Sequence, residues 1–584
     1  MVPAFVRFAV VASSIVLIPT LAGAQTERVA IDRSTQAEGQ DSVSVLAKAR
    51  TAQASFERFR FTRLPRSWTR SSGRCDENIG RFCFFFSDSE QGDQPPPEPP
   101  VIAERRRDLL VSFAQAAAAL PGDEWIVGQR VRYLLEAGDE DGGIAAARAC
   151  RAERWWCAAL EGMALHEAQR FAEAEEVFAA ALAAMPADER ERWTDVEILL
   201  RPADKRAWRT IEEADRARLL RRMWWLADPL WSEPGNDRRT EHFARWTMDR
   251  IQQRARQVDL TRWGDDLTEI VLRYGWFTAW ERSEPIFYTS TQSSTAVGYN
   301  EPRTWEFIPP LETVRDPTLL RGDEWPLSES QPTTTRYAPE YARHIMMLPH
   351  QLAVFPRRTG ALLVAGYALP EDSLPADPRL RAALVAMDDA GGRRSESPWQ
   401  PNAASGAMYV ELPATNTVIS LELREDSTRA VARRRQAVAW DADARVSDLL
   451  LLAHPDARPV EVMEAARIAR GSAILAPGER VGVFWEMYDV EESDSVQVRV
   501  GLIPSRAVWG RRRLEAVGIV KGARTVRMGW SEGVEAGPVV GRSLAVGIPP
   551  DLRPGDYTLE VTVTAPGMPP ATARRPITVR RVEP

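Results

Sequence analysis

The hydrophobic pattern of this chain changes its period part-way along the sequence. In residues 102–193 the apolar side chains recur every three or four positions, as they do in amphipathic helices. Beyond residue 339 they recur every second position, which is typical of strands with one buried face. The chain has 584 residues, whereas a single core stops growing at roughly 250 to 300 residues. We therefore predict an α+β multidomain protein whose N-terminal half is a helical repeat array.

Two groups of predicted strands follow one another in the second half of the chain. The first group comprises residues 351–355, 361–367, 382–387, 408–412, 418–423 and 447–453, with a turn at 388–392. The second group comprises residues 481–488, 496–503, 525–530, 543–548, 557–564 and 577–582. Residues 554–563 resemble the penultimate strands of immunoglobulin-like or fibronectin-like modules, in which a tyrosine, here Tyr557, ties a corner to the backbone. We predict two C-terminal β-sandwich domains, and this fold alone implies no activity.

The first 24 residues have the order of a removable export signal. A leader with one positive charge, Arg7, precedes the mainly apolar residues 8–22, and Ala22-Gly23-Ala24 supplies a small-x-small cleavage site. The apolar stretch is short for a membrane span, although an uncleaved anchor is the alternative. We predict an exported protein, periplasmic or extracellular, whose mature chain begins at Gln25 and has no transmembrane span.

The four cysteines form two close pairs, Cys75 with Cys83 and Cys150 with Cys157. An even number of cysteines in an exported chain favours disulfide bonds. A zinc site would need tighter ligand spacing or nearby histidines, whereas the five histidines are scattered along the chain. We therefore expect two disulfides, no metal ion and no cofactor.

Residues 158–186 resemble a tetratricopeptide repeat, in which small residues let two helices approach, an aromatic side chain fills the gap and a proline stops the second helix. The matching residues are Gly162, Ala174, Phe178, Ala181 and Pro186. The preceding segment, residues 125–152, has a similar length, and we interpret it as a degenerate copy of the same repeat. The resemblance implies stacked helix pairs with a groove that binds another polypeptide, and a plain helical spacer is the alternative.

Residues 221–275 resemble the GWxTD domain of bacterial exported proteins. The matching residues are Asp228, Pro229, Asn236, Glu241, Arg245, Trp263, Asp266, Tyr274 and Gly275. Arg262 stands where the name-giving glycine belongs and Asp265 where the threonine belongs, so a diverged relative is the fitting description. The family offers no established chemistry that the resemblance would imply here.

Composition and motifs narrow the function without naming it. The 75 basic residues against 82 acidic ones leave no positive field for nucleic acid, and the common catalytic signatures are absent from the sequence. Twenty tryptophans keep sugar stacking open, although their helical spacing favours burial. Asp265, Asp266 and Glu269 are the carboxylates that acid/base work on a glycan would use. We predict a non-catalytic scaffold that binds an unidentified protein in the bacterial envelope. A glycan-binding or glycan-cleaving envelope protein is the alternative.

The predicted organisation has seven parts. Residues 1–24 form the signal peptide, 25–100 a helical, disulfide-bearing segment with a proline-rich linker, 101–200 the tetratricopeptide-like array, 201–282 the GWxTD-like helical region, 283–338 a loop-rich connector, 339–460 the first β-sandwich and 470–584 the immunoglobulin- or fibronectin-like β-sandwich.

Overall fold

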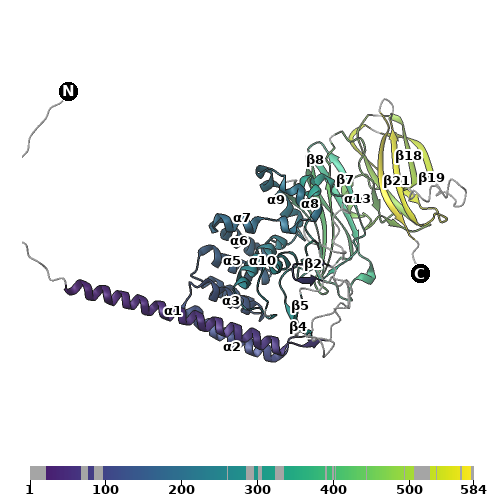
Figure 1. The fold of residues 1–584 in the computed structure, drawn as a ribbon. Helices are drawn as coiled ribbons and strands as arrows, with labels where there is room; N and C mark the ends of the chain where they lie inside the picture. Colours follow the sequence, from purple (N-terminus) through teal and green to yellow (C-terminus); the bar gives the residue numbers. More distant parts are fainter. Residues whose placement is uncertain are drawn as a thin grey trace, which may run out of the picture.

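The structure is a computed structural model, and its helices gather in the first half of the chain while its strands gather in the second (Figure 1). It describes residues 22–67, 77–84, 97–259, 261–283, 295–299, 306–321, 334–337, 339–388, 391–397, 400–401, 403–441, 443–491, 493–505, 526–534, 536–565 and 569–580. The α+β multidomain prediction is confirmed. The apolar part of the predicted signal peptide lies almost wholly outside these residues. No helix in the described ranges is long and apolar enough to span a membrane.

Eleven α-helices build the first half within the described residues. They are α1 (Ala22–Arg63), α2 (Pro100–Ala119), α3 (Glu124–Leu135), α4 (Glu140–Arg148), α5 (Arg154–Glu167), α6 (Phe171–Ala184), α7 (Ala187–Thr194), α8 (Pro202–Arg209), α9 (Glu213–Ala227), α10 (Asp237–Gln253) and α11 (Asp265–Tyr274). Asp123, Asp139 and Asn236 each accept a backbone N–H at the start of a helix, as good capping residues do. Helix α1 runs along α2 and projects from the helical body (Figure 1).

Helix α10 completes the core of the array. It packs against α3, α5 and α6, so that Phe243 and Ile251 share one hydrophobic cluster with Trp156 and Phe178. Figure 1 shows α10 close to α3, α5 and α6. The predicted tetratricopeptide-like and GWxTD-like segments therefore contribute to a common core.

The helix hairpin α5–α6 has the close approach that the repeat-like pattern predicts. Ala174, Phe178 and Ala181 are buried on α6, and a Cβ at Gly162 would stand 2.9 Å from the Phe178 ring. A side chain at position 162 would push the two helices apart. Pro186 precedes α7 after α6 has ended at Ala184.

The Cys150–Cys157 disulfide is present, with the two Cα atoms 5.6 Å apart. It joins the end of α4 to the first turn of α5, as the sequence predicts. Cys75 lies outside the described residues, and Cys83 lies in β3 (Phe82–Phe84), which pairs with β2 (Glu77–Ile79). The predicted bond between them stays a prediction.

The first β-sandwich has two sheets over one core. Its strands are β6 (His344–Ile345), β7 (His350–Arg357), β8 (Gly360–Ala368), β9 (Leu380–Asp388), β10 (Arg393–Glu396), β11 (Gln400–Pro401), β12 (Ser405–Pro413), β13 (Thr417–Glu425) and β14 (Ala430–Val438). One sheet has the order β10-β9-β13-β14-β6, with β11 paired to β9, and the other β12-β8-β7. Leu363 and Leu421, one from each sheet, lie in the shared core. Strand β14 is an addition to the predicted set.

The second β-sandwich packs β15-β17-β20 over β16-β22-β21-β18-β19. These strands are β15 (Leu450–Leu452), β16 (Ile474–Leu475), β17 (Arg480–Val490), β18 (Ser493–Pro504), β19 (Val526–Val534), β20 (Gly537–Gly547), β21 (Gly555–Thr564) and β22 (Ala571–Val579). The Tyr557 hydroxyl donates to the carbonyl oxygen of Arg553 at 2.9 Å, which is the predicted corner tie. Strand β15 pairs with β17, so it belongs to this sandwich rather than to the first group of strands.

Short elements connect these parts. They are β1 (Arg66–Ser67), η1 (Glu197–Leu199), β4 (Ala279–Ser283), β5 (Thr295–Tyr299), α12 (Leu311–Arg315), η2 (Pro317–Leu319), η3 (Glu371–Ser373) and α13 (Val462–Arg467). Strands β1, β4 and β5 form a small sheet, and α13 packs where the two sandwiches meet.

The outer face of the first sandwich joins the helical half through a buried carboxylate. Glu422 of β13 is fully buried and accepts the backbone N–H groups of Trp231 and Ser232 at 3.0 and 2.9 Å. Arg435 of β14 pairs with Glu422 at 3.3 Å and donates to the carbonyl of Asp228 at 2.9 Å. The loop between α9 and α10 is thereby bound to the sheet, and α9 and α12 cover the same face with apolar side chains.

Replacing Gly162 tests the close approach of α5 and α6. We expect Gly162→Ala to lower the free energy of unfolding by about 1 to 3 kcal/mol, because the new methyl group overpacks against Phe178. The loss should shrink in a Phe178→Leu background, since the two positions are in contact. Urea unfolding of the four chains measures both effects. A gain of about 1 kcal/mol for Gly162→Ala, as at an exposed helical site, would contradict the packing.

Replacing Glu422 tests the junction between the helical half and the first sandwich. Glu422→Ala removes the carboxylate that neutralises the buried Arg435 and that accepts two backbone N–H groups, so we expect a loss of about 3 to 5 kcal/mol. Urea unfolding followed by tryptophan fluorescence gives the value. The matched control is Glu411→Ala, at an exposed position on β12, for which about 0.5 kcal/mol or less is expected. Equal losses would show that Glu422 does not hold the junction.

Candidate functional site

A groove of about 550 Å³ lies between α1 and α2. Its α1 wall presents short side chains at three- and four-residue spacing, and its α2 wall adds polar ones. The lining includes Ser44, Ala47, Lys48, Thr51, Ala52 and Ser55 of α1 with Arg105, Asp108 and Ser112 of α2. Phe56 and Leu109 are the buried apolar residues at its base. A groove lined by short side chains with charged ones beside them suits a polypeptide segment better than a small apolar molecule.

A buried ion-pair network fixes α1 beneath this groove. Glu57 is fully buried on α1 and accepts a hydrogen bond from the Tyr133 hydroxyl of α3. Arg60 pairs with Glu136 at 3.1 Å, and Arg132 pairs with the same carboxylate at 2.8 Å. Buried charges are tolerated when they are paired in this way. The network joins α1 to the end of α3 and so sets the position of the wall.

The two glutamates of this network titrate in opposite directions. Burial raises the pKa of Glu57 above its ordinary value, and Arg60 and Arg132 only partly offset it. Burial also opposes ionisation of Glu136, but Arg132, Arg60 and Arg106 outweigh it and lower the pKa of Glu136 to about 2. The Glu136 carboxylate therefore keeps its charge in the folded protein.

The repeat-like residues lie away from this groove. Gly162, Ala174, Phe178 and Ala181 all face the contact between α5 and α6, and none of them lines the groove. Their role is packing. The resemblance placed a polypeptide-binding groove on the repeat-like residues 158–186, whereas the groove described here is lined by α1 and α2.

Several GWxTD-like residues converge on α10. Asn236 caps the helix and donates from Nδ2 to the carbonyl of Trp224 at 2.7 Å. Glu241 accepts from Arg245 Nε at 2.5 Å, and Arg245 also donates to the carbonyl of Leu272 at 3.0 Å. Gly275 ends α11 with φ +86, and a Cβ there would stand 3.4 Å from Arg245 Nη2. The pattern thus holds α10 and α11 together.

The remaining members of that pattern lie at two other contacts. The carbonyl oxygens of Asp228 and Pro229 accept hydrogen bonds from Arg433 of β14. Asp266 pairs with Arg81 at 2.6 Å, and Trp263 donates to Asp249 at 2.8 Å. The structure therefore divides the predicted set between the α10 contacts, the sandwich junction and the α11 surface.

Of the three carboxylates weighed for glycan chemistry, Asp266 and Glu269 are held by arginines, and Asp265 is exposed in the first turn of α11. Asp266 is bound by Arg81, whose hydrogen bonds lower the Asp266 pKa to about 2. Glu269 pairs with Arg273 at 2.9 Å, one turn along α11. Tyr274 accepts from Arg273 and donates to Glu77. A carboxylate with a pKa near 2 is a poor general acid at neutral pH.

A second charged cluster lies between α5 and α10, and sequence reasoning missed it. His166 Nε2 is 2.8 Å from Glu241 Oε2, and its Nδ1 is 2.8 Å from the Thr240 hydroxyl. Burial opposes ionisation of Glu241, but Arg245 and His166 lower the Glu241 pKa below its usual range. Asp237 accepts from the Tyr341 hydroxyl at 2.7 Å, and burial raises its pKa to about 6. The contact joins helices far apart in sequence, so no local pattern could reveal it.

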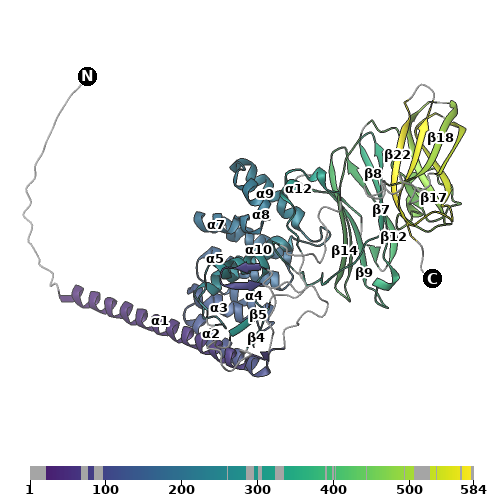
Figure 2. The same ribbon diagram turned by 45° about the vertical axis from the view of Figure 1, so that its right-hand side comes forward.

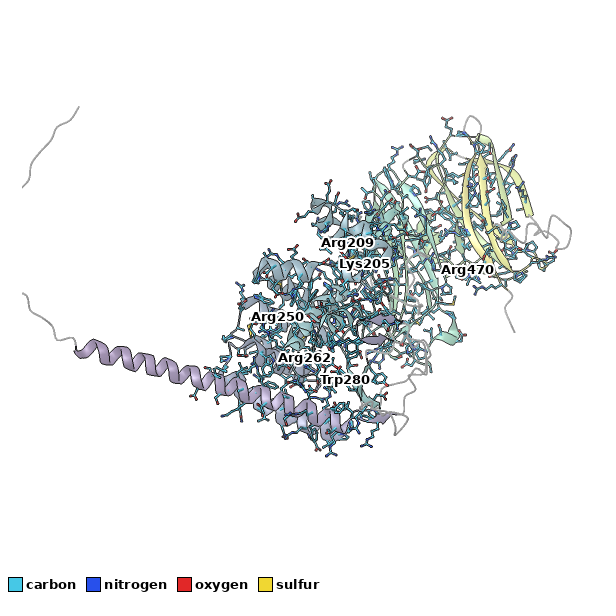
Figure 3. The ribbon with its side chains drawn as sticks, in the orientation of Figure 1. Lys205, Arg209, Arg250, Arg262, Trp280 and Arg470 are labelled. Carbon is cyan, nitrogen blue, oxygen red and sulfur yellow. A yellow bond between two sulfur atoms is a disulfide. The ribbon has the colours of Figure 1, made fainter. Side chains whose placement is uncertain are left out.

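The tryptophans are mostly packing residues. Trp155 and Trp193 meet edge to face in the array core, and the Arg250 guanidinium, labelled in Figure 3, lies 4.7 Å from the Trp155 ring centre. Trp231 lies 3.9 Å from the Arg435 guanidinium at the sandwich junction. Among the residues that the structure describes, every tryptophan is buried or half-buried.

Comparisons with known proteins do not assign the chain to a family. No protein-family model and no curated protein matches it. One solved structure with a local likeness comes from a study of glycolipid glycan hydrolysis by a family 123 glycoside hydrolase of Clostridium perfringens. The match has 11% identity and a TM-score of 0.15 and covers 24% of this chain and 28% of that one. Another is the C-terminal domain of Wzt, with 11% identity, a TM-score of 0.14 and coverage of 24% and 77%. The chain spans just over a quarter of the hydrolase, and neither likeness carries an argument about function.

The lowered pKa of Glu136 predicts an acid-sensitive attachment of α1. The unfolded chain binds a proton at this carboxylate near pH 4.5, whereas the folded protein does so only near pH 2. The contribution of Glu136 is therefore complete above pH 4.5 and is lost as the pH falls toward 2. We expect Glu136→Gln to lower the free energy of unfolding at neutral pH and the deficit to shrink between about pH 4.5 and pH 2.

Urea titrations at several pH values measure this deficit. Glu104→Gln, at an exposed position on α2, is the matched control and should leave the pH profile unchanged. A Glu136→Gln deficit that stays constant over the whole range would contradict the assignment.

Proposed function

We propose that this protein is an exported, non-catalytic scaffold that binds a polypeptide of the bacterial envelope through the groove between α1 and α2. The observation that carries the proposal is the groove itself, whose α1 wall is joined to α3 by the Glu57 and Glu136 network. The first 24 residues have the order of an export signal, and the Cys150–Cys157 disulfide suits an oxidising compartment.

The two β-sandwiches support a spacer role. Their cores are filled by apolar side chains, and the two sandwiches contact each other through Phe355 and Phe484, whose ring centres are 5.8 Å apart. Figure 2 shows the first sandwich lying between the helical half and the second sandwich, as a spacer would. The glycan alternative has less support, because the described part of the chain offers no exposed tryptophan on which a sugar would stack.

Site-specific cross-linking in the cell envelope tests the groove directly. A photoreactive p-benzoylphenylalanine is placed at Ala47, in the groove, or at Ala103, an exposed position on α2 outside its lining. We expect position 47 to capture one reproducible polypeptide and position 103 to capture none. Deleting residues 102–185 is unsuitable as a test, because α5 and α6 share a core with α10.

A second pair of variants checks that capture reports binding. Ala47→Trp fills the groove and should abolish co-purification of the captured polypeptide, whereas Ala103→Trp adds the same side chain elsewhere and should retain it. Equal capture at both positions, or equal loss in both tryptophan variants, would remove the groove as the binding site. Bound glycan without any polypeptide would favour the alternative function.

A further inference from the structure

Three ligand-forming side chains converge where α5 ends against α10. They are His166 and Glu167, the last two residues of α5, and Glu241 of α10. One donor atom from each lies within 4.8 Å of those of the other two. His166 and Glu241 are buried and Glu167 is exposed, so the cluster reaches solvent on the side of Glu167.

The side chain of His166 presents its Nε2 atom to the carboxylate of Glu241. The other ring nitrogen, Nδ1, lies 2.8 Å from the Thr240 hydroxyl, which also contacts the carbonyl oxygen of Asp237 at 3.1 Å. Nε2 lies 2.8 Å from Glu241 Oε2, so a proton or a metal ion placed between these two atoms binds both of them.

Glu167 places a third ligand group beside His166 and Glu241, and a proton shared by those two residues does not need it. Within the described ranges it has no ion pair within 4.0 Å and no side-chain hydrogen bond, although Glu140 and Glu340 add further negative charge near it. The carboxylate also stands at the C-terminal end of α5, where the helix dipole favours a cation. The surroundings of the Glu167 carboxylate therefore favour the binding of a cation.

The two buried ligands, Glu241 and His166, are each held by a second contact at the atom that does not face the site. Arg245 binds the other carboxylate oxygen of Glu241 at 2.5 Å, and Thr240 holds the other ring nitrogen of His166. Contacts of this kind orient ligands at metal sites and fix the tautomer of a coordinating histidine. Arg245 uses only Oε1, so Oε2 stays directed at His166.

We propose that His166, Glu167 and Glu241 form a binding site for a divalent transition-metal ion, with Zn²⁺ as the best-fitting ion. Zinc accepts imidazole nitrogen together with carboxylate oxygen, whereas Mg²⁺ and Ca²⁺ take oxygen ligands. Zn²⁺ binds Nε2 and Oε2 in place of the proton, and the exposed Glu167 side chain closes onto it. Three protein ligands leave the fourth position of a tetrahedral site for water or a partner's side chain. This inference is independent of the α1–α2 groove.

Zinc titration of the mature chain tests the site. The protein from residue 25 onward is stripped with a chelator and titrated with Zn²⁺ in competition with a chromophoric chelator. We expect one Zn²⁺ per chain in the native protein, a loss of at least about tenfold in affinity for Glu167→Gln, and no binding for His166→Gln. Glu173→Gln, at an exposed glutamate of α6 that pairs with Arg170, is the matched control and should bind as the native chain does.

Glu167→Gln keeps the test decisive if His166→Gln fails to fold, because Glu167 is exposed and makes no hydrogen bond that the fold needs. Zn²⁺ should also raise the melting temperature of the native chain and of Glu173→Gln but not of Glu167→Gln. Substitution with Co²⁺ gives a second readout, since the ligand-field spectrum should change in Glu167→Gln. A native chain that binds no Zn²⁺, or a Glu167→Gln variant that binds it equally well, would overturn the proposal.

Discussion

The helical half depends on the burial of α10 on almost every side. This helix buries Glu241 and Arg245 as an ion pair, and it also buries Arg238, whose guanidinium nitrogens have no hydrogen-bond partner among the described residues. Glu241 lies between Arg245 and His166, which ties α10 to α5. Burial and the neighbouring Arg245 lower the pKa of Arg238 to about 10. The charges of α10 thus restrict it to one orientation, and the helices around it pack to that orientation.

The same constraint continues into the β-sandwiches. Asn236 at the start of α10 binds the end of α9, and the loop between these helices is bound by Glu422 and Arg435 of the first sandwich. Phe355 and Phe484 then join the first sandwich to the second. A chain of buried contacts therefore runs from α10 to the C-terminal half. The parts that sequence patterns suggest as separate modules share interfaces that resemble domain cores.

Local pattern predicted much of this fold. Period-two alternation located most long strands, because each has one buried face, and the spacing of Cys150 and Cys157 predicted their bond. Strand β14 was missed because Arg433, Arg434 and Arg435 interrupt its alternation. Arg435 is nevertheless buried, since Glu422 on the neighbouring strand supplies its charge partner. A buried ion pair reverses the usual relation between polarity and exposure, and only the paired strand reveals it.

Other features could not be predicted because they depend on which elements meet. Strand β15 has the apolar pattern of either sandwich, and its pairing with β17 is a property of the chain's path. The α1–α2 groove joins helices on either side of the proline-rich linker 94–100. The cluster of His166, Glu167 and Glu241 likewise joins the repeat-like segment to the GWxTD-like one. Each of these needs a contact that neither segment encodes alone.

The residues of the GWxTD-like pattern have structural roles in the packing of α10 and α11. Asn236 starts α10, Glu241 and Arg245 neutralise each other inside it, and Gly275 ends α11 with a φ of +86° that other residues rarely adopt. A chain that keeps these residues keeps a buried helix in place, whatever it binds. The chemistry proposed for the site needs His166 and Glu167 in addition, and both come from the preceding helix hairpin. In this chain the pattern accounts for the contacts around α10, and the proposed metal site depends in addition on the two residues that end α5, the first helix of that hairpin.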